Sequence, residues 1–194
     1  YGQAEAYLGA SEFRYFKYVT KIPRLPEDID NAYQWIKSEV NKSLHRLNVQ
    51  SLYGLLLHRS QDLCGGSASL VKRALQQLKD EGVVRKVGVS IYSPSELEQI
   101  GLDSGLDLVQ APLNLVDRRL ATSGWLDLLR ERGVEVHVRS VFLQGILLAS
   151  RSDRPPVFSR WEILWKVWQD WQQDHEDISP IEACLGYVQS VPGI

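Results

Sequence analysis

The sequence contains no methionine, only two cysteines and no long hydrophobic run. Cys64 and Cys184 lie far apart and lack the C-x-x-C spacing of a zinc or redox pair, so we expect two reduced thiols and no metal site. No apolar stretch approaches the roughly 20 residues that a membrane-spanning helix needs, and residues 1–3 do not begin a signal peptide. These absences predict a cytoplasmic protein without a membrane partner. The missing initiator methionine predicts a fragment of a longer chain.

The sequence also lacks an excess of positive charge. Its 22 lysines and arginines are outnumbered by 24 aspartates and glutamates, and the hydrophobic fraction of 44% is typical of a globular domain. The basic residues are scattered among acidic ones, so no positive patch is available for a phosphate backbone. We therefore expect no nucleic-acid partner.

Apolar runs alternate with amphipathic segments of helical length along the chain. This alternation is typical of parallel sheets built from β-α-β units. The predicted strands cover residues 16–22, 52–58, 84–91, 106–111 and 134–142. A complete (β/α)8 barrel usually needs about 250 residues. The pattern therefore predicts one incomplete domain over residues 1–194, folded as a partial (β/α)8 barrel of about five parallel strands with helices outside.

Helix boundaries are marked by capping residues. Apolar residues at helical spacing predict a helix over 29–47, and further helices over 69–81 and 120–131 end at Gly82 and Gly133. Another helix is predicted to begin at Ser93, with proline at the next position and a glutamate that completes a capping box.

A tryptophan stripe follows the polar loop at 153–156. Its members, spaced so that they share one helix face, are Trp161, Trp165, Trp168 and Trp171. We expect this helix to pack on the outer wall of the barrel, because aromatic stripes usually mark burial. An aromatic lid over a ligand is the alternative.

Polar residues of one alternation parity lie at or near the end of each predicted strand: Lys21, His58, Ser90, Gln110 and Arg139. Side chains alternate between the two faces of a strand, so these residues are predicted to point into the barrel together with Leu52, Gly54 and Leu56 of the second strand. Barrel enzymes place their catalytic groups at this carboxyl end. Glu135 and His137 lie deeper on the same face as Arg139, where they could pair with it or form a structural polar network.

Short motifs along the chain resemble those of the aldo-keto reductase family in order and spacing. They are Tyr1-Gly2 with Glu5 and Leu8-Gly9, Val19-Thr20-Lys21, Leu55-Leu56-Leu57-His58, residues 82–90, Val109-Gln110 with Leu113-Asn114, and Arg139-Ser140 through Gln144-Gly145. Each motif alone is weak, but the ordered set covers nearly the whole sequence.

The resemblance implies reduction of an aldehyde or ketone by hydride transfer from NADPH, with NADH possible. It implies catalytic roles for Tyr1, Lys21 and His58, and an aspartate that would precede Tyr1. The implied cofactor contacts are Ser90, Gln110, Arg139, Ser140, Leu143 and Gly145. Two positions depart from the family pattern: Ile91 replaces a common asparagine, and Arg139 replaces an aromatic ring that stacks on the nicotinamide.

The residue types themselves suit this chemistry. Free tyrosine titrates near pH ~10, so Tyr1 would need a nearby cation such as Lys21 to act as a general acid. A neutral His58 would donate a hydrogen bond to the substrate oxygen and help to stabilise the developing alkoxide.

Several alternatives remain open. A Schiff-base lyase barrel could use Lys21 as nucleophile and Tyr1 as proton carrier. A non-catalytic barrel could bind nicotinamide only to regulate a partner. For the reductase, Arg118, Arg119 and Arg139 favour a polyhydroxylated or acidic carbonyl substrate, and we expect residues 1–194 alone to be inactive.

Overall fold

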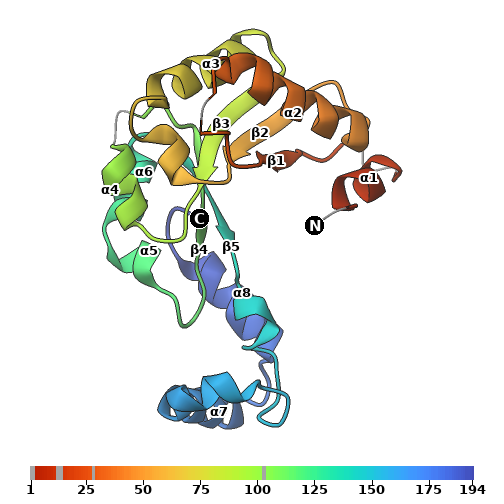
Figure 1. Cartoon of the computed structure of the whole chain (residues 1–194). Helices are drawn as coiled ribbons and strands as arrows, with labels where there is room; N and C mark the ends of the chain where they lie inside the picture. The colour runs from red at the N-terminus through yellow and green to blue at the C-terminus, as the bar shows by residue number, and fades with distance from the viewer. Residues whose placement is uncertain (1–2, 12–14, 28, 102–103) are drawn as a thin grey trace.

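The computed structural model describes residues 3–11, 15–27, 29–101 and 104–194, and the strands in this part of the chain form one parallel sheet (Figure 1). The strand order is β1-β2-β3-β4-β5. Their bounds are β1 (Val19–Ile22), β2 (Leu52–Leu57), β3 (Val84–Ser90), β4 (Leu108–Pro112) and β5 (Glu135–Arg139). Sequential order with parallel pairing is the arrangement of a partial barrel and confirms the predicted fold class.

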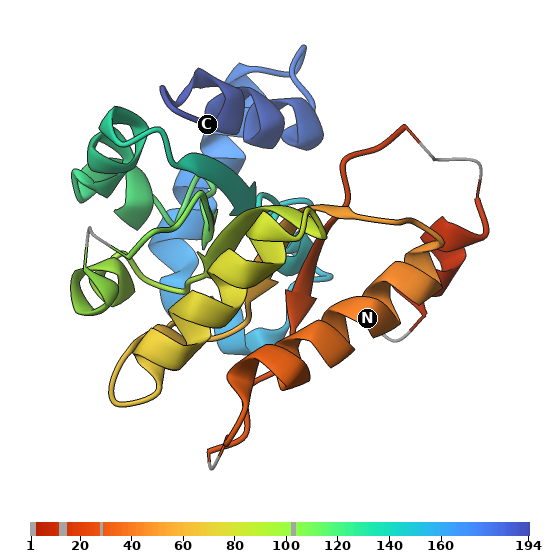
Figure 2. The same cartoon turned by 90° about the horizontal axis from the view of Figure 1, so that it is seen from above.

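Helices flank the sheet; the first precedes β1, and the others connect consecutive strands (Figures 1 and 2). Their bounds are α1 (Ala4–Gly9), α2 (Ala32–Leu47), η1 (Ser60–Leu63), α3 (Ala68–Asp80), α4 (Ser95–Ile100), α5 (Arg119–Thr122) and α6 (Trp125–Glu131). The main hydrophobic core lies between the sheet and these helices. It joins Ile36 of α2 and Leu78 of α3 to Leu55, Val87 and Val109 of the strands.

Local backbone geometry explains where the structure differs from the predicted boundaries. The predicted helix over 120–131 is divided into α5 and α6, because Gly124 adopts a left-handed conformation at φ +80°. The predicted strand over 134–142 ends at Arg139, since Ser140 also has a positive φ of +59°. The helix predicted over 29–47 begins after Asn31, whose side chain accepts a hydrogen bond from the Gln34 N–H.

The two faces of the sheet are packed differently. Leu55 and Leu57 face the outer helices, whereas Leu56 and Leu108 are fully buried outside that core cluster. The prediction that Leu52 points into the barrel is wrong, because Leu52 packs with Leu55 in the outer core cluster. Its shift accompanies an irregular start of β2, where the N–H groups of residues 53 and 54 both donate to the carbonyl of residue 18.

Two glycines make room for the leucines of the inner face. A Cβ added to Gly88 would lie 1.8 Å from the backbone oxygen of Leu108 and 2.9 Å from Leu56 Cδ2. A Cβ added to Gly54 would lie 2.9 Å from Leu108 Cδ2. On the inner face of the sheet, Leu56 and Leu108 therefore pack directly against the backbone of Gly54 and Gly88.

A charged network lies toward the amino ends of the strands. The Glu135 carboxylate accepts hydrogen bonds from the Tyr53 hydroxyl and from Lys86, and it lies 2.8 Å from His137 Nε2. Glu135 and His137 thus form a structural network with Lys86. Among the described residues, neither Glu135 nor His137 forms an ion pair with Arg139. Partial burial raises the pKa of Glu135, but the hydrogen bonds from its neighbours outweigh this effect and lower it to about 2.

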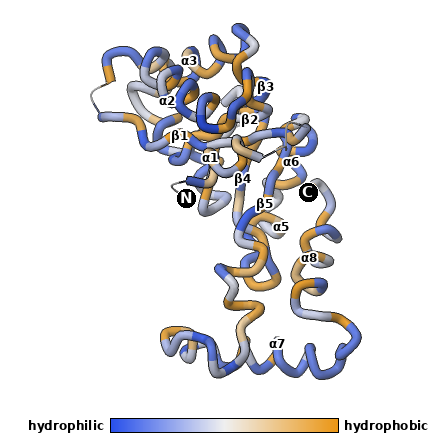
Figure 3. Tube along the Cα trace, turned by 90° about the vertical axis from the view of Figure 1, so that its right-hand side faces the viewer, coloured by the Kyte–Doolittle hydropathy of each residue, from blue (hydrophilic) through white to orange (hydrophobic). Residues whose placement is uncertain are grey.

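The tryptophan stripe belongs to a second hydrophobic cluster. It involves η2 (Leu143–Gly145), η3 (Pro156–Trp161), α7 (Glu162–Asp174) and α8 (Pro180–Ser190). Trp165 and Trp168 are buried there against Leu147 and Cys184, and residues 115, 141 and 142 from the loops after β4 and β5 also contribute. Figure 3 shows α7 at the opposite end of the molecule from α2 and α3. The expected position on the outer wall of the barrel is therefore wrong.

Hydrogen bonds explain why the stripe is held on these loops. The indole N–H of Trp165 donates to the Phe158 carbonyl at 2.9 Å, and that of Trp168 donates to the Leu147 carbonyl at 3.1 Å. Trp161 precedes α7 and remains 42% exposed, so the stripe is only partly buried. Within the described residues, no helix is both long and apolar enough to span a membrane.

We expect Gly88→Ala to lower the free energy of unfolding of the complete protein by about 1–3 kcal/mol, because the new methyl group meets a backbone oxygen that cannot rotate away. Denaturant unfolding measures the change. Gly66→Ala is the matched control, since a Cβ at Gly66 meets nothing within 4 Å and should leave stability almost unchanged. Equal stability of the two variants would contradict the close packing at Gly88.

We expect Glu135 to stabilise the fold above about pH 4.5 and to lose this contribution as the pH falls toward 2, because its pKa is lowered in the folded state. The carboxylate is about a third exposed, so solvent screening reduces the effect to roughly 1 kcal/mol. Glu135→Gln should therefore be less stable than the parent at pH 7, and the difference should shrink through pH 3 and disappear only below about pH 2. Glu131→Gln, at the exposed end of α6, serves as the control. A stability difference that does not change with pH would argue against the network.

Candidate functional site

The carboxyl ends of the strands bring several predicted site residues together. The Lys21 ammonium of β1 donates to Gln110 Oε1 of β4 at 2.9 Å, and the Ser90 hydroxyl of β3 donates to the same oxygen at 3.4 Å. Ser90 is buried, Gln110 is half-buried, and Lys21 is the most exposed of the three. Side chains from separate strands thus meet around one amide oxygen, as the strand alternation predicts.

Lys21 lies in an environment that disfavours its charged form. Partial burial lowers the pKa of its ammonium, and the positive charge of Arg139 lowers it further. The oxygen that Lys21 contacts belongs to a neutral amide. The ammonium therefore loses its proton at a lower pH than an ordinary lysine.

Arg139 is the last residue of β5 and lies at the same end of the sheet as Lys21, Ser90 and Gln110. Its Nη2 donates to the Ile91 carbonyl at 3.0 Å, and its Nη1 donates to the Ser140 hydroxyl at 3.3 Å. The guanidinium lies over the ring of Tyr92, with the central carbon 4.4 Å from the ring centroid. Its Nε is buried without a hydrogen-bond partner. Neutral groups thus fix the plane of this cation.

Ile91 contributes its backbone to the site. Its side chain is buried in the outer core, which follows from its position next to Ser90 in the alternation. Its N–H donates to the Gln110 carbonyl, and its carbonyl accepts from Arg139. The residue that departs from the family pattern therefore packs on the helix side of the sheet and offers no side-chain polar group to the site.

The segment after β5 forms a tight turn. Ser140, Leu143, Gln144 and Gly145 all have positive φ values, between +47° and +87°. The Leu143 N–H donates to the Ser140 carbonyl at 2.8 Å, and the Gly145 N–H donates to the Phe142 carbonyl at 2.9 Å. A phosphate bound here would therefore have to replace these two backbone bonds or use other donors of the turn.

Asn114 connects this turn to the preceding loop. It is fully buried, and its side-chain amide donates to the Ser140 carbonyl at 3.0 Å. Its Oδ1 accepts from the N–H groups of Val116 and Asp117. Asp117 in turn pairs with Arg119. Asn114 and Asp117 therefore hold the loop after β4 in place against the turn after β5.

His58 and Tyr1 are the remaining predicted catalytic residues. His58 directly follows β2 and is exposed at the same end of the sheet. Tyr1 lies outside the described residues. No hydrogen bond joins His58 to Lys21 in the structure, so the described residues place these two side chains at one sheet edge without direct contact.

Two residues near the site were not singled out from the sequence. Tyr92 supplies the ring under Arg139, and a signal for it was its position directly after the third strand. Asp62 lies in η1 within electrostatic range of His58, and burial raises the pKa of its carboxyl although a backbone hydrogen bond from Leu25 opposes this. Its Oδ2 is buried without a partner. Nothing in the local sequence pattern distinguished this aspartate from a surface one.

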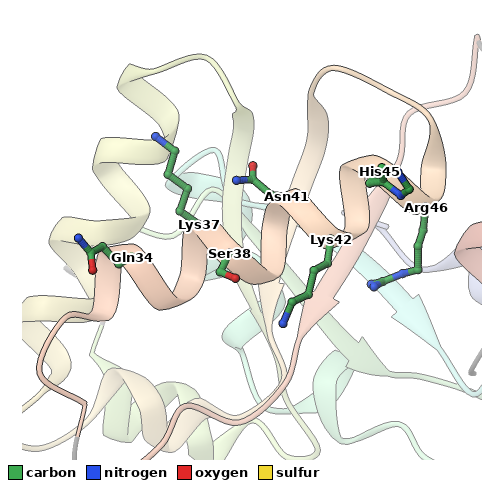
Figure 4. Close-up of a pocket in the computed structure, with 7 residues that line it drawn as sticks. All are labelled: Gln34, Lys37, Ser38, Asn41, Lys42, His45 and Arg46. Atoms are coloured by element: carbon green, nitrogen blue, oxygen red, sulfur yellow. The ribbon is translucent and has the colours of Figure 1, made fainter.

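Two hollows on the surface are lined by residues other than Lys21, Ser90, Gln110 and Arg139. The hollow in Figure 4 is lined entirely by side chains of α2, from Gln34 to Arg46. A larger groove of about 1150 Å³ lies between α7 and α8 and is mostly apolar, with Trp168 and Tyr187 among its lining residues. Within the described residues, no group of three or more histidine, cysteine, aspartate or glutamate side chains could hold a metal ion.

Comparisons with known proteins show to which family the chain belongs. The model of the Aldo/keto reductase family matches residues 1–193. The uncharacterized oxidoreductase YqkF of Bacillus subtilis (strain 168) is 26% identical over 177 residues, which cover 85% of this chain and 55% of that protein. The NADH-specific methylglyoxal reductase of Escherichia coli (strain K12) is 27% identical over 132 residues, which cover 67% of this chain and 40% of that protein.

A solved structure shows the same architecture. The holo form of aldo-keto reductase AKR11C1 from Bacillus halodurans is 26% identical, with a TM-score of 0.61, and the match covers 78% of this chain and 52% of that one. The chain thus spans about half the length of the relatives it matches. Because the family match extends over residues 1–193 and the sheet follows the fold of a known reductase, the chain belongs to the aldo-keto reductase family, and its five strands are part of a (β/α)8 barrel.

Proposed function

We propose that the complete protein reduces an aldehyde or ketone to an alcohol with a nicotinamide cofactor, and that residues 1–194 form one incomplete barrel domain of it. The observation that carries this proposal is the meeting of Lys21, Ser90 and Gln110 at the carboxyl ends of three strands. Family membership supports oxidoreductase chemistry in general. The partner is then a small-molecule carbonyl compound.

In this proposal Tyr1 is the proton donor and Lys21 supplies the cation that favours its phenolate form. His58 donates a hydrogen bond to the carbonyl oxygen and orients it. Tyr1 and His58 together stabilise the negative charge that develops on this oxygen as the reaction proceeds. The family pattern also implies an aspartate before Tyr1.

The residues around the site suit a nicotinamide cofactor, which supplies the hydride when it is bound. Ser90 and Gln110 offer a buried hydroxyl and an amide, and the unpartnered Nε of Arg139 is a polar atom that the described residues leave unsatisfied. We propose that Ser90 and Gln110 bind the carboxamide and that Arg139 lies beside the ring.

We propose further that the turn after β5, with Ser140, Leu143 and Gly145, holds the phosphates. Positive φ values make its backbone compact enough for close approach of a ligand. NADPH is the proposed cofactor, and NADH is the alternative. We keep NADH as an alternative because one relative, in Escherichia coli, is named an NADH-specific reductase.

One observation favours a second candidate. The lowered pKa of Lys21 is the property that a Schiff-base lysine needs, because the neutral amine is the nucleophile. In such a lyase, borohydride treatment with substrate would attach the substrate covalently to Lys21. A reductase leaves Lys21 unmodified. The further alternative of a non-catalytic nicotinamide-binding barrel predicts cofactor binding without turnover.

We expect the complete protein to bind a reduced nicotinamide dinucleotide, NADPH or NADH, because Ser90, Gln110 and the turn after β5 lie at one end of the sheet. Cofactor fluorescence during titration measures the two dissociation constants. Gln110→Ala removes the amide shared by Lys21 and Ser90 and should weaken binding by roughly tenfold. The absence of a saturable signal with either cofactor would rule out the reductase proposal.

We expect Tyr1→Phe to reduce turnover by at least about 10²-fold while cofactor affinity changes little, because the variant removes the acid and keeps the ring. His58→Gln can still donate a hydrogen bond and should cost less. Steady-state rates and cofactor titration of the same preparations separate these effects. If Tyr1→Phe stays within a few-fold of the parent, the proton comes from another group.

We expect the rate to fall at alkaline pH as the Lys21 cation is lost, and to do so below the ordinary lysine value of about 10.4, because the pKa of Lys21 is lowered. Lys21→Met removes the cation and should raise the pKa of the Tyr1 phenol, so this limb of the pH profile should shift and the rate should fall. The pH dependence of kcat is the measurement. A variant that keeps the parent profile would show that another group titrates.

A further inference from the structure

Arg139 has a positive charge that the described residues do not neutralise. Both of its hydrogen bonds go to neutral oxygens, of Ile91 and Ser140, and its flat face lies on the Tyr92 ring. No carboxylate of the described residues lies within 4 Å of its guanidinium nitrogens. The nearby acids have other partners, since Asp117 pairs with Arg119 and Glu135 pairs with Lys86.

A second cation shares this end of the sheet. Lys21 contacts the neutral Gln110 amide and no carboxylate of the described residues. The lowered pKa of Lys21, which burial causes first and Arg139 second, shows that the two charges act on each other. In the proposed reaction Lys21 is reserved for the general acid, so Arg139 is the charge that a bound ligand can use.

The Arg139 guanidinium has a fixed orientation, and some of its N–H donors have no hydrogen-bond partner among the described residues. Arginine has five N–H donors, and the two hydrogen bonds of Arg139 leave three of them without a partner among the described residues. One of these, the Nε–H, is buried, so a ligand would use the remaining donors of Nη1 and Nη2. Its half-buried position makes an unpaired charge costly. A carboxylate or phosphate offers two oxygens in the planar spacing that such a fork binds best.

We propose that Arg139 is a specificity-determining residue that binds an anionic group, a carboxylate or a phosphate, on the carbonyl substrate. This inference rests on the proposed reductase function, because a residue beside the nicotinamide ring is also beside the carbonyl that the ring reduces. The cofactor phosphates are the competing source of the same chemistry, and the experiment separates the two.

The test compares two aldehydes of similar length, succinic semialdehyde with a carboxylate and butanal without one, in the complete protein at constant ionic strength. The parent should have a higher kcat/KM for succinic semialdehyde. Arg139→Gln should lower the ratio of the two kcat/KM values by about 10- to 100-fold, the range for a hydrogen-bonded charge. Arg139→Lys keeps the charge without the fork and should give an intermediate ratio.

A matched control removes one positive charge elsewhere. Arg73→Gln, on the exposed face of α3, should leave the ratio unchanged. The dissociation constant of NADPH is measured for every variant. An unchanged ratio in Arg139→Gln would overturn the proposal. So would an equal loss for both aldehydes that follows a weaker NADPH affinity, because Arg139 would then serve the cofactor.

Calorimetric binding of succinate, without cofactor, tests the anion site independently of turnover. Succinate should bind the parent at least tenfold more tightly than Arg139→Gln. If neither aldehyde is reduced but this difference is found, the reductase proposal fails and the anion site stands. If the aldehydes are reduced but succinate binds both proteins equally or neither of them, the reductase proposal stands and the role of Arg139 is wrong.

Discussion

The approach of β4 to β3 is the constraint on which the site depends. Leu108 and Gly88 are register partners, and the absence of a side chain at Gly88 allows the Leu108 backbone to lie where a Cβ would be. Leu56 and Leu108 then fill the inner layer. Ser90 and Gln110, two residues further along the same strands, are register partners as well. Their contact around one amide oxygen is therefore set by packing deeper in the sheet, in the way that rigid strands position barrel active sites.

Much of the fold could be predicted because strand and helix periodicities are local signals. The parallel strands follow from apolar runs, and the inward position of Ser90 and Gln110 follows from alternation. The end of β5 could not be predicted, since a positive φ at Ser140 is uncommon for a non-glycine residue and has no sequence signature. The location of α7 could not be predicted either. Periodicity shows that tryptophans share a face, but it does not show which surface this face covers.

The candidate site was predictable as a set of positions and less so as a set of contacts. Strand parity identified Lys21 and Arg139, but the sequence could not show that Arg139 turns toward Tyr92 and the Ile91 carbonyl instead of Glu135. Arg139 does not pair with Glu135 because Lys86, which lies on β3, already does. Long-range pairing of this kind depends on register between strands, which alternation within one strand does not fix.

Charged side chains are therefore paired differently at the two ends of the sheet. Toward the amino ends, Glu135 collects hydrogen bonds from Lys86, Tyr53 and His137, so each charge has a partner and the network holds strands together. At the carboxyl ends, Lys21 and Arg139 contact neutral oxygens, and the Nε of Arg139 has no partner. A partly buried cation is costly when it has no carboxylate partner, and neither of these two has one among the described residues. The ion pair of Glu135 and Lys86 thus lies toward the amino ends, and the proposed ligand site lies at the carboxyl ends, where barrel enzymes bind their ligands.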